Sequence, residues 1–136
     1  MSDRAHILVV EDVAMMRRLV ELALGRAGYE VSGAADGAQA LQHLVGRRVD
    51  AVVLDIDLPD MDGFTVAARL RTMAGRTIPV IFMTTFGAPE MAAKVAAAGS
   101  AVLLVKPFSL GDLLQTLAAG LTLVPPRDAP TANVTD

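Results

Sequence analysis

Cysteine and tryptophan are both absent from this chain of 136 residues, and tyrosine occurs only once. The lack of cysteine excludes a disulfide scaffold, a thiolate zinc site and a cysteine nucleophile, and it suits a reducing compartment. Every apolar run is far shorter than the ~20 residues that span a bilayer, and the polar start of the chain predicts no signal peptide. We therefore expect a cytoplasmic protein without a membrane partner.

Strong charge of either sign is missing as well, since the formal net charge is only −3. So mild a charge does not attract nucleic acid, and we expect no direct nucleic-acid partner. The pairs Arg17–Arg18 and Arg47–Arg48 are interpreted as parts of solvated helix faces. An apolar content of 53% and a mean hydropathy of +0.47 are typical of a packed domain, and the length suits one domain.

Short apolar runs alternate with amphipathic stretches along the chain. The more mixed segment Tyr29–Ala34 predicts an edge strand. Four aliphatic runs predict buried parallel strands, namely Ile7–Val10, Ala51–Leu54, Val80–Met83 and Ala101–Val105. Apolar residues at three- and four-residue spacing predict helices within Val13–Ala27, Gly37–Val45, Phe64–Met73, Ala88–Ala98 and Leu110–Leu121.

This alternation predicts a single α/β domain, a (βα)5 doubly wound fold with a parallel five-stranded sheet. We assign residues 1–123 to that domain. Residues 124–136 contain three prolines and have no periodicity, so they are interpreted as a flexible C-terminal tail or a linker stub.

Polar side chains follow four of the predicted strands: Glu11 and Asp12 the first, Asp55 and Asp57 the third, Thr84 the fourth, and Lys106 the fifth. Ligands bind outside the carboxyl ends of the strands in an open parallel sheet, so these residues should meet at one rim. Each alone has an ordinary structural explanation, such as a helix cap. Three crowded acids, however, repel one another unless a cation neutralises them, and hard oxygen ligands suit Mg²⁺.

The same positions lie in a longer ordered pattern. Its parts are Glu11-Asp12 after Ile-Leu-Val-Val, Val53-Leu-Asp55-Ile-Asp-Leu-Pro59-Asp-Met-Asp-Gly63, Thr84 after Val-Ile-Phe-Met, Ala98-Gly99-Ser100, and Lys106-Pro107-Phe108. Over residues 5–122 the chain thereby resembles the receiver domain of two-component response regulators, whose fold is flavodoxin- or CheY-like. The resemblance implies a phosphorelay protein that carries out only its own phosphotransfer and autodephosphorylation, and is not an enzyme with turnover.

The resemblance also implies a role for each matching residue. Asp55 is expected to accept a phosphoryl group from a histidine kinase or a histidine phosphotransfer protein. Asp12 and Asp55 would ligate Mg²⁺ directly, Glu11 through a water, and Asp57 through its backbone carbonyl. Thr84 and Lys106 would bind phosphoryl oxygens, and the Lys106–Pro107 peptide would be cis.

The chain departs from the family where an aromatic switch residue usually stands, three positions before the lysine. Leu103 occupies that place, and Phe86 is a candidate substitute. Output is expected on the face formed by Ala88–Ala98, Ala101–Val105 and Leu110–Leu121, against a partner or a second copy of the chain. The carboxylate of Asp57 is expected near the mouth of the site, where it would alter acylphosphate hydrolysis.

Three alternatives stay open at this point. Asp55-Ile-Asp57 also resembles the nucleophile motif of haloacid-dehalogenase-type phosphatases, although those place it on the first strand. A flavodoxin-like nucleotide-binding module shares the architecture, but Glu11-Asp12 stands where a phosphate loop is needed. A pseudo-receiver without phosphorylation is the third, although every catalytic position is filled.

Overall fold

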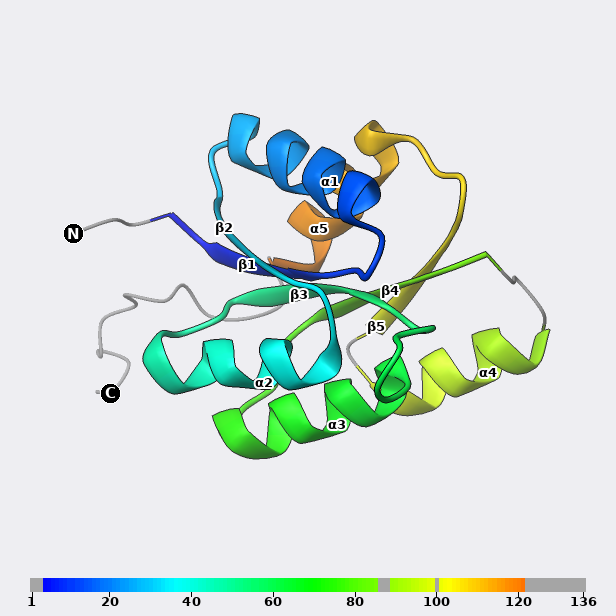
Figure 1. The fold of residues 1–136 in the computed structure, drawn as a ribbon. Helices are drawn as coiled ribbons and strands as arrows, with labels where there is room; N and C mark the ends of the chain where they lie inside the picture. Colours follow the sequence, from blue (N-terminus) through cyan, green and yellow to red (C-terminus); the bar gives the residue numbers. More distant parts are fainter. Residues whose placement is uncertain (1–3, 86–88, 100, 122–136) are drawn as a thin grey trace, which may run out of the picture.

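Five parallel strands form one sheet in the order β2-β1-β3-β4-β5 (Figure 1). The computed structural model describes residues 4–85, 89–99 and 101–121. Its elements are β1 His6–Val10, α1 Ala14–Arg26, β2 Glu30–Ala34, α2 Gly37–Gly46, β3 Ala51–Asp55, α3 Gly63–Ala74, β4 Val80–Thr84, α4 Pro89–Ala98, β5 Ala101–Val105 and α5 Leu110–Leu121. The fold class predicted from the alternating pattern is confirmed.

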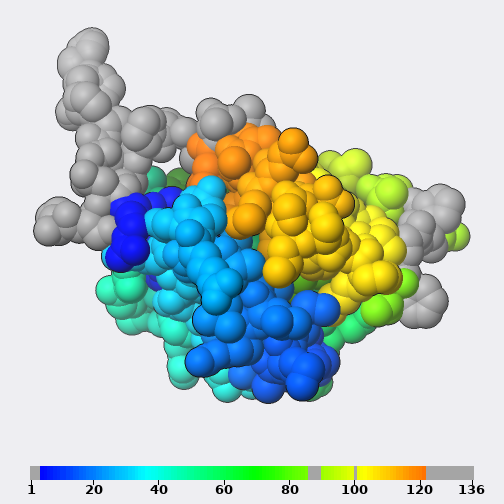
Figure 2. Space-filling model, turned by 90° about the horizontal axis from the view of Figure 1, so that it is seen from above, coloured from blue at the N-terminus to red at the C-terminus, as the bar shows by residue number. Residues whose placement is uncertain are grey.

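The helices form two layers, with α1 and α5 on one face of the sheet and α2, α3 and α4 on the other (Figure 1). Viewed onto the first of these faces, α1 and α5 lie side by side (Figure 2). Successive strand side chains point to opposite faces, so Ile7 and Val9 pack with α1 and α5, and Leu8 and Val10 pack in the other core. Because both faces are covered, every residue of β1, β3 and β4 is buried.

One strand differs from the sequence-based prediction. The run Ala101–Val105 was predicted to be buried, but β5 lies at the edge of the sheet and is only partly covered. Val102 is 45% exposed and Val105 is 42% exposed. An apolar run marks a strand but does not place it, because an edge strand that faces a partner is as aliphatic as a central one. The predicted edge position of Tyr29–Ala34 is confirmed by β2.

The predicted domain end at residue 123 and the tail 124–136 lie outside the described residues. Among those that are described, none of the helices combines the length and the apolar character that crossing a membrane requires.

A buried histidine, His6, begins β1 and so lies at the opposite end of the strand from Glu11. The Nδ1 atom of His6 lies 2.8 Å from the carbonyl oxygen of Arg48, and Nε2 lies 2.7 Å from the Ser32 hydroxyl. A carbonyl only accepts, so Nδ1 carries the proton in the neutral ring and Nε2 accepts from Ser32. Burial lowers the pKa of His6 below 6.5, although the hydrogen bond to Arg48 acts in the opposite direction.

We expect an NMR titration of the His6 ring to give an apparent pKa below 6.5. The unfolded chain then binds more protons than the folded chain in acid. The contribution of His6 to the free energy of unfolding is therefore fully present above about pH 6.5 and is lost as the pH is lowered below it. The variant His6→Gln, which does not titrate, should lose less stability between pH 7.5 and pH 5.5 in urea unfolding. An equal loss in both proteins would contradict this assignment.

Candidate functional site

The backbone ladder of the sheet continues one residue beyond three strand ends. These hydrogen bonds join, donor first, Glu11 to Ala34 at 3.0 Å, Ile56 to Met83 at 3.0 Å, and Lys106 to Thr84 at 2.7 Å. Each of these residues is therefore fixed by a neighbouring strand rather than by its own loop. Rigid elements hold functional groups more accurately than loops do, so the rim of the sheet is preorganised.

A close approach of backbones follows Asp55. The N–H of Gly63 donates to the carbonyl of Ile56 at 2.8 Å. A Cβ atom at Gly63 would lie 2.7 Å from the carbonyl oxygen of Asp55 and 2.8 Å from the Cα of Ile56. Only glycine permits α3 to begin this close to β3, which explains why Gly63 ends the motif that begins with Asp55.

Three carboxylates meet at this rim, as the sequence predicted. Glu11, Asp12 and Asp55 each offer a ligand oxygen, and these oxygens lie within 4.8 Å of one another. Glu11 is fully buried and Asp55 is 5% exposed, whereas Asp12 faces solvent. Hard oxygen donors with one side open to water fit Mg²⁺, which keeps several of its waters when it binds a protein. The donor set therefore fits the ion that the sequence implied.

Lys106 supplies the opposite charge. Its Nζ lies 2.7 Å from Oε1 of Glu11 and 3.3 Å from Oδ2 of Asp55. Burial acts to lower the pKa of Lys106, but the hydrogen bond that Lys106 donates to Glu11 and the charge of Asp55 outweigh it, so the pKa is raised and the ammonium persists. When all groups are ionised, the three acids and this ammonium leave two net negative charges, which one divalent ion neutralises.

The structure brings the other two predicted residues to the same rim in different ways. Asp57 is exposed, and its carboxylate is not part of the acid cluster. Its backbone N–H donates to Oδ1 of Asp55 at 3.0 Å, so its main chain and not its side chain contacts the site. Thr84 is buried at the end of β4. The Lys106–Pro107 peptide is cis, as predicted.

Arg17 has a role that the sequence did not reveal. It was interpreted as part of a solvated helix face, yet its Nη1 donates to the carbonyl oxygen of Glu11 at 2.8 Å. Glu21, one turn further along α1, lies 3.8 Å from the same guanidinium. The contact joins α1 to the end of β1, and periodicity could not predict it because it depends on how the helix is docked.

The positions tied to switching are only partly described. Leu103 pairs in register with Phe82 of β4, and its side chain packs against the core below α3 and α4. It is half-buried, so the place of the usual aromatic residue is filled by an aliphatic one. Phe86, the candidate substitute, lies outside the described residues.

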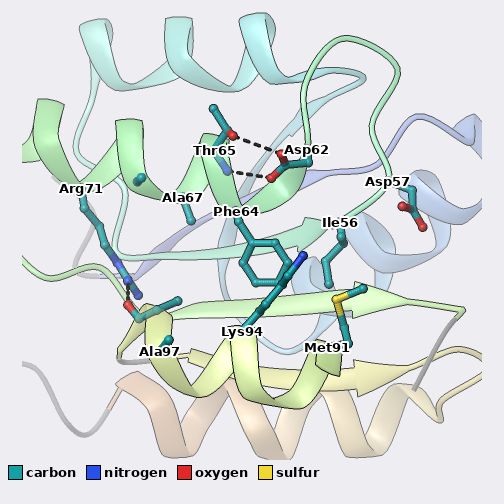
Figure 3. Close-up of a pocket in the computed structure, with 12 residues that line it drawn as sticks. Ile56, Asp57, Asp62, Phe64, Thr65, Ala67, Arg71, Met91, Lys94 and Ala97 are labelled. Atoms are coloured by element: carbon teal, nitrogen blue, oxygen red, sulfur yellow. Dashed lines mark hydrogen bonds between the residues drawn. The ribbon is translucent and has the colours of Figure 1, made fainter. Parts of the chain in front are cut away.

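Two hollows flank the site. The smaller, of about 360 Å³, is lined by Asp12 and residues 56–62. The larger, of about 740 Å³, lies between α3 and α4, with Phe64 at its centre and Asp57 and Arg71 toward opposite ends (Figure 3). Glu11, Asp12 and Asp55 do not line this larger groove. Of the three acids, Asp12 alone lines the smaller hollow, and Asp57 lines both hollows.

Comparison with known proteins shows where such a fold and rim occur. The sequence profile of the response regulator receiver domain matches residues 7–118. The sensor histidine kinase RcsC of Salmonella typhi is 38% identical over 117 residues, which are 86% of this chain and 12% of RcsC. The transcriptional regulatory protein TcrA of Mycobacterium tuberculosis is 42% identical over 114 residues, which are 84% of this chain and 45% of TcrA.

A solved structure agrees. The chemotaxis protein CheY4 of Vibrio cholerae is 36% identical, with a TM-score of 0.80, and the match covers 85% of this chain and 98% of CheY4. The receiver domain family to which these similarities point acts as a signalling switch rather than as a classical enzyme. The chain belongs to the response regulator receiver domain family of two-component phosphorelay signalling. It spans 12% of RcsC and less than half of TcrA.

The ion pair between Lys106 and Glu11 generates a stability prediction. The variant Lys106→Met leaves Glu11 buried without its cation, so in buffer free of divalent ions we expect the free energy of unfolding to fall by about 2–4 kcal/mol. The double variant Glu11→Gln, Lys106→Met should regain part of this loss. Urea unfolding measures both.

Lys94→Met is the matched control, because Lys94 is exposed on α4. It should change stability by no more than about 0.5 kcal/mol. Equal stability of Lys106→Met and wild type would show that the ion pair contributes nothing.

Proposed function

We propose that Asp55 accepts a phosphoryl group from a phosphohistidine, in a reaction that requires Mg²⁺. The observation that carries the proposal is the cluster of three carboxylates around one ammonium at the end of the sheet. A carboxylate oxygen of Asp55 attacks phosphorus, the phosphorus–nitrogen bond breaks, and its electron pair leaves with the imidazole. The product is an acylphosphate, which water later hydrolyses.

The residues of the rim divide the work of this transfer. Asp12, Asp55 and Glu11 would hold Mg²⁺, with a further ligand from the Asp57 carbonyl, and the ion would neutralise charge on the phosphoryl oxygens. Lys106 already contacts Asp55, so its ammonium is in place for one phosphoryl oxygen. Thr84 would offer its hydroxyl to another.

The proposal also covers the phosphoryl donor and the output surface. The proposed donor is a histidine kinase or a histidine phosphotransfer protein, and the proposed location of the transfer is the cytoplasm. The output surface is α4-β5-α5, where Val102, Val105 and Leu110 are each more than 40% exposed. Exposed aliphatic side chains of this kind suit a partner protein or a second copy of the chain. We assign residues 1–123 to the receiver domain and 124–136 to a tail or linker.

Labelling by a small phosphodonor tests the central claim. In the presence of Mg²⁺, we expect acetyl phosphate or phosphoramidate to add one phosphoryl group, which mass spectrometry locates on Asp55. Chelation of Mg²⁺ should reduce the labelling at least tenfold, because the anionic rim then repels the donor. Asp55→Asn should take no label, and Asp112→Asn, an exposed acid in α5, should be labelled like wild type.

Two outcomes would overturn the proposal: no label under saturating donor, or equal labelling of Asp55→Asn. The phosphatase alternative is tested in the same experiment. Multiple turnovers of a general phosphate ester without a lasting acylphosphate would favour it over a receiver.

The exposed carboxylate of Asp57 leads to a separate prediction about hydrolysis. The Asp57 main chain contacts Asp55, and the Asp57 side chain is exposed to water, so we propose that this carboxylate accepts a proton from the attacking water. We expect Asp57→Asn to lengthen the acylphosphate lifetime by about twofold to tenfold, measured by loss of label after donor removal. Asp112→Asn serves again as the control, and a lifetime equal to wild type would exclude this role for Asp57.

A further inference from the structure

The loop of residues 56–62, here called the phosphoacceptor loop, joins β3 to α3 and carries Asp57. Several contacts tie it to its immediate neighbours, among them the bond from the Asp57 N–H to Asp55, the bond from the Gly63 N–H to the Ile56 carbonyl, and the bond from the Thr65 N–H to Oδ1 of Asp62 at 2.9 Å. A further contact leaves the loop for another helix. Asp60 accepts from the N–H of Gly37 at 2.9 Å through Oδ1 and from the N–H of Ala38 at 3.0 Å through Oδ2.

These two bonds complete the first turn of α2. The first four N–H groups of a helix have no partner within the helix. The N–H of Gln39 donates to Oδ1 of Asp36 at 2.8 Å, and the N–H of Ala40 makes the first bond of the helix itself, to the Asp36 carbonyl at 3.1 Å. Asp60 takes the N–H groups of Gly37 and Ala38, so the first turn of α2 is capped partly by Asp36 and partly by the phosphoacceptor loop.

An apolar contact supports the same joint. A Cβ atom at Gly37 would lie 2.6 Å from Cγ of Met61 and 2.9 Å from Cγ2 of Val66. The side chain of Met61, which follows Asp60, thus occupies the space that a Cβ atom on Gly37 would need. The pKa of Asp60 is lowered, chiefly by the hydrogen bond from Gly37, so Asp60 remains an anion at the positive end of the helix.

We propose that Asp60 is a positioning residue for the metal site. By holding the phosphoacceptor loop against the N-terminus of α2, it fixes the position of the Asp57 main chain relative to Asp12 and Asp55. The inference rests on the proposed function. Asp55 itself is held by the sheet, through the Ile56 to Met83 hydrogen bond, and does not need the clamp. Asp57 has no such ladder bond. One hydrogen bond joins its N–H to the Asp55 side chain, so the position of its carbonyl also depends on how the rest of the loop is anchored.

Asp60→Ala tests the clamp through Mg²⁺ affinity, measured without phosphodonor from the amide NMR shifts of residues 11–12 and 55–57. We expect the dissociation constant to rise about tenfold, the lower end of what residues supporting metal ligands contribute. Asp60→Asn keeps one of the two oxygens that accept these N–H groups and replaces the other with an NH₂ donor, so it should fall between wild type and Asp60→Ala. Labelling of Asp55 in Asp60→Ala should be slow at low Mg²⁺ and recover at saturating Mg²⁺.

Asp36→Ala is the matched control, since it removes a cap from the same helix without touching the loop. It should lower the melting temperature and leave the Mg²⁺ dissociation constant unchanged. Equal affinity of Asp60→Ala and wild type, or an equal loss in both variants, would overturn the clamp alone. Failure of the wild-type protein to bind Mg²⁺ would overturn the clamp together with the proposed function, and the two results are therefore distinguishable.

Discussion

The contact of one ammonium with two carboxylates at the end of the sheet is the interaction on which the rest of the site depends. Glu11 is fully buried beside Asp55, and two carboxylates at such a place repel each other unless a cation lies between them. Lys106 touches both. The remaining negative charge would favour a divalent ion here, so the charge imbalance that opposes burial of the acids would also attract the proposed ion.

The fold meets this electrostatic demand with backbone hydrogen bonds. Glu11, Ile56 and Lys106 each donate a ladder bond beyond the end of a strand, which holds charged groups together against their mutual repulsion. Loops alone would relax and separate them. The rim exists because the carboxyl ends of all the parallel strands lie along one side of the sheet. Helices cover both faces of the sheet, and the resulting burial strengthens each charge interaction.

The sequence predicted the elements and the acids well, because both follow from local patterns. Short aliphatic runs mark strands buried on two faces, and polar residues after them lie at one rim. Three features escaped prediction: the exposure of β5, the contact of Arg17 with Glu11, and the bonds from Asp60 to α2. Each depends on which elements become neighbours, and an aspartate that caps another helix looks in sequence like any loop acid.

The strand order places the two buried acids on inner strands and Lys106 next to the edge strand. Glu11 follows β1 and Asp55 is the last residue of β3, and each of these strands is paired on both sides, whereas Lys106 follows β5 at the edge of the sheet. In the free protein its ammonium lies closer to Glu11 than to Asp55. A phosphoryl group on Asp55 would add negative charge and draw the ammonium across, and an edge strand with partly exposed side chains resists that shift least. The surface that would report the event is then the one formed by β5 and its flanking helices.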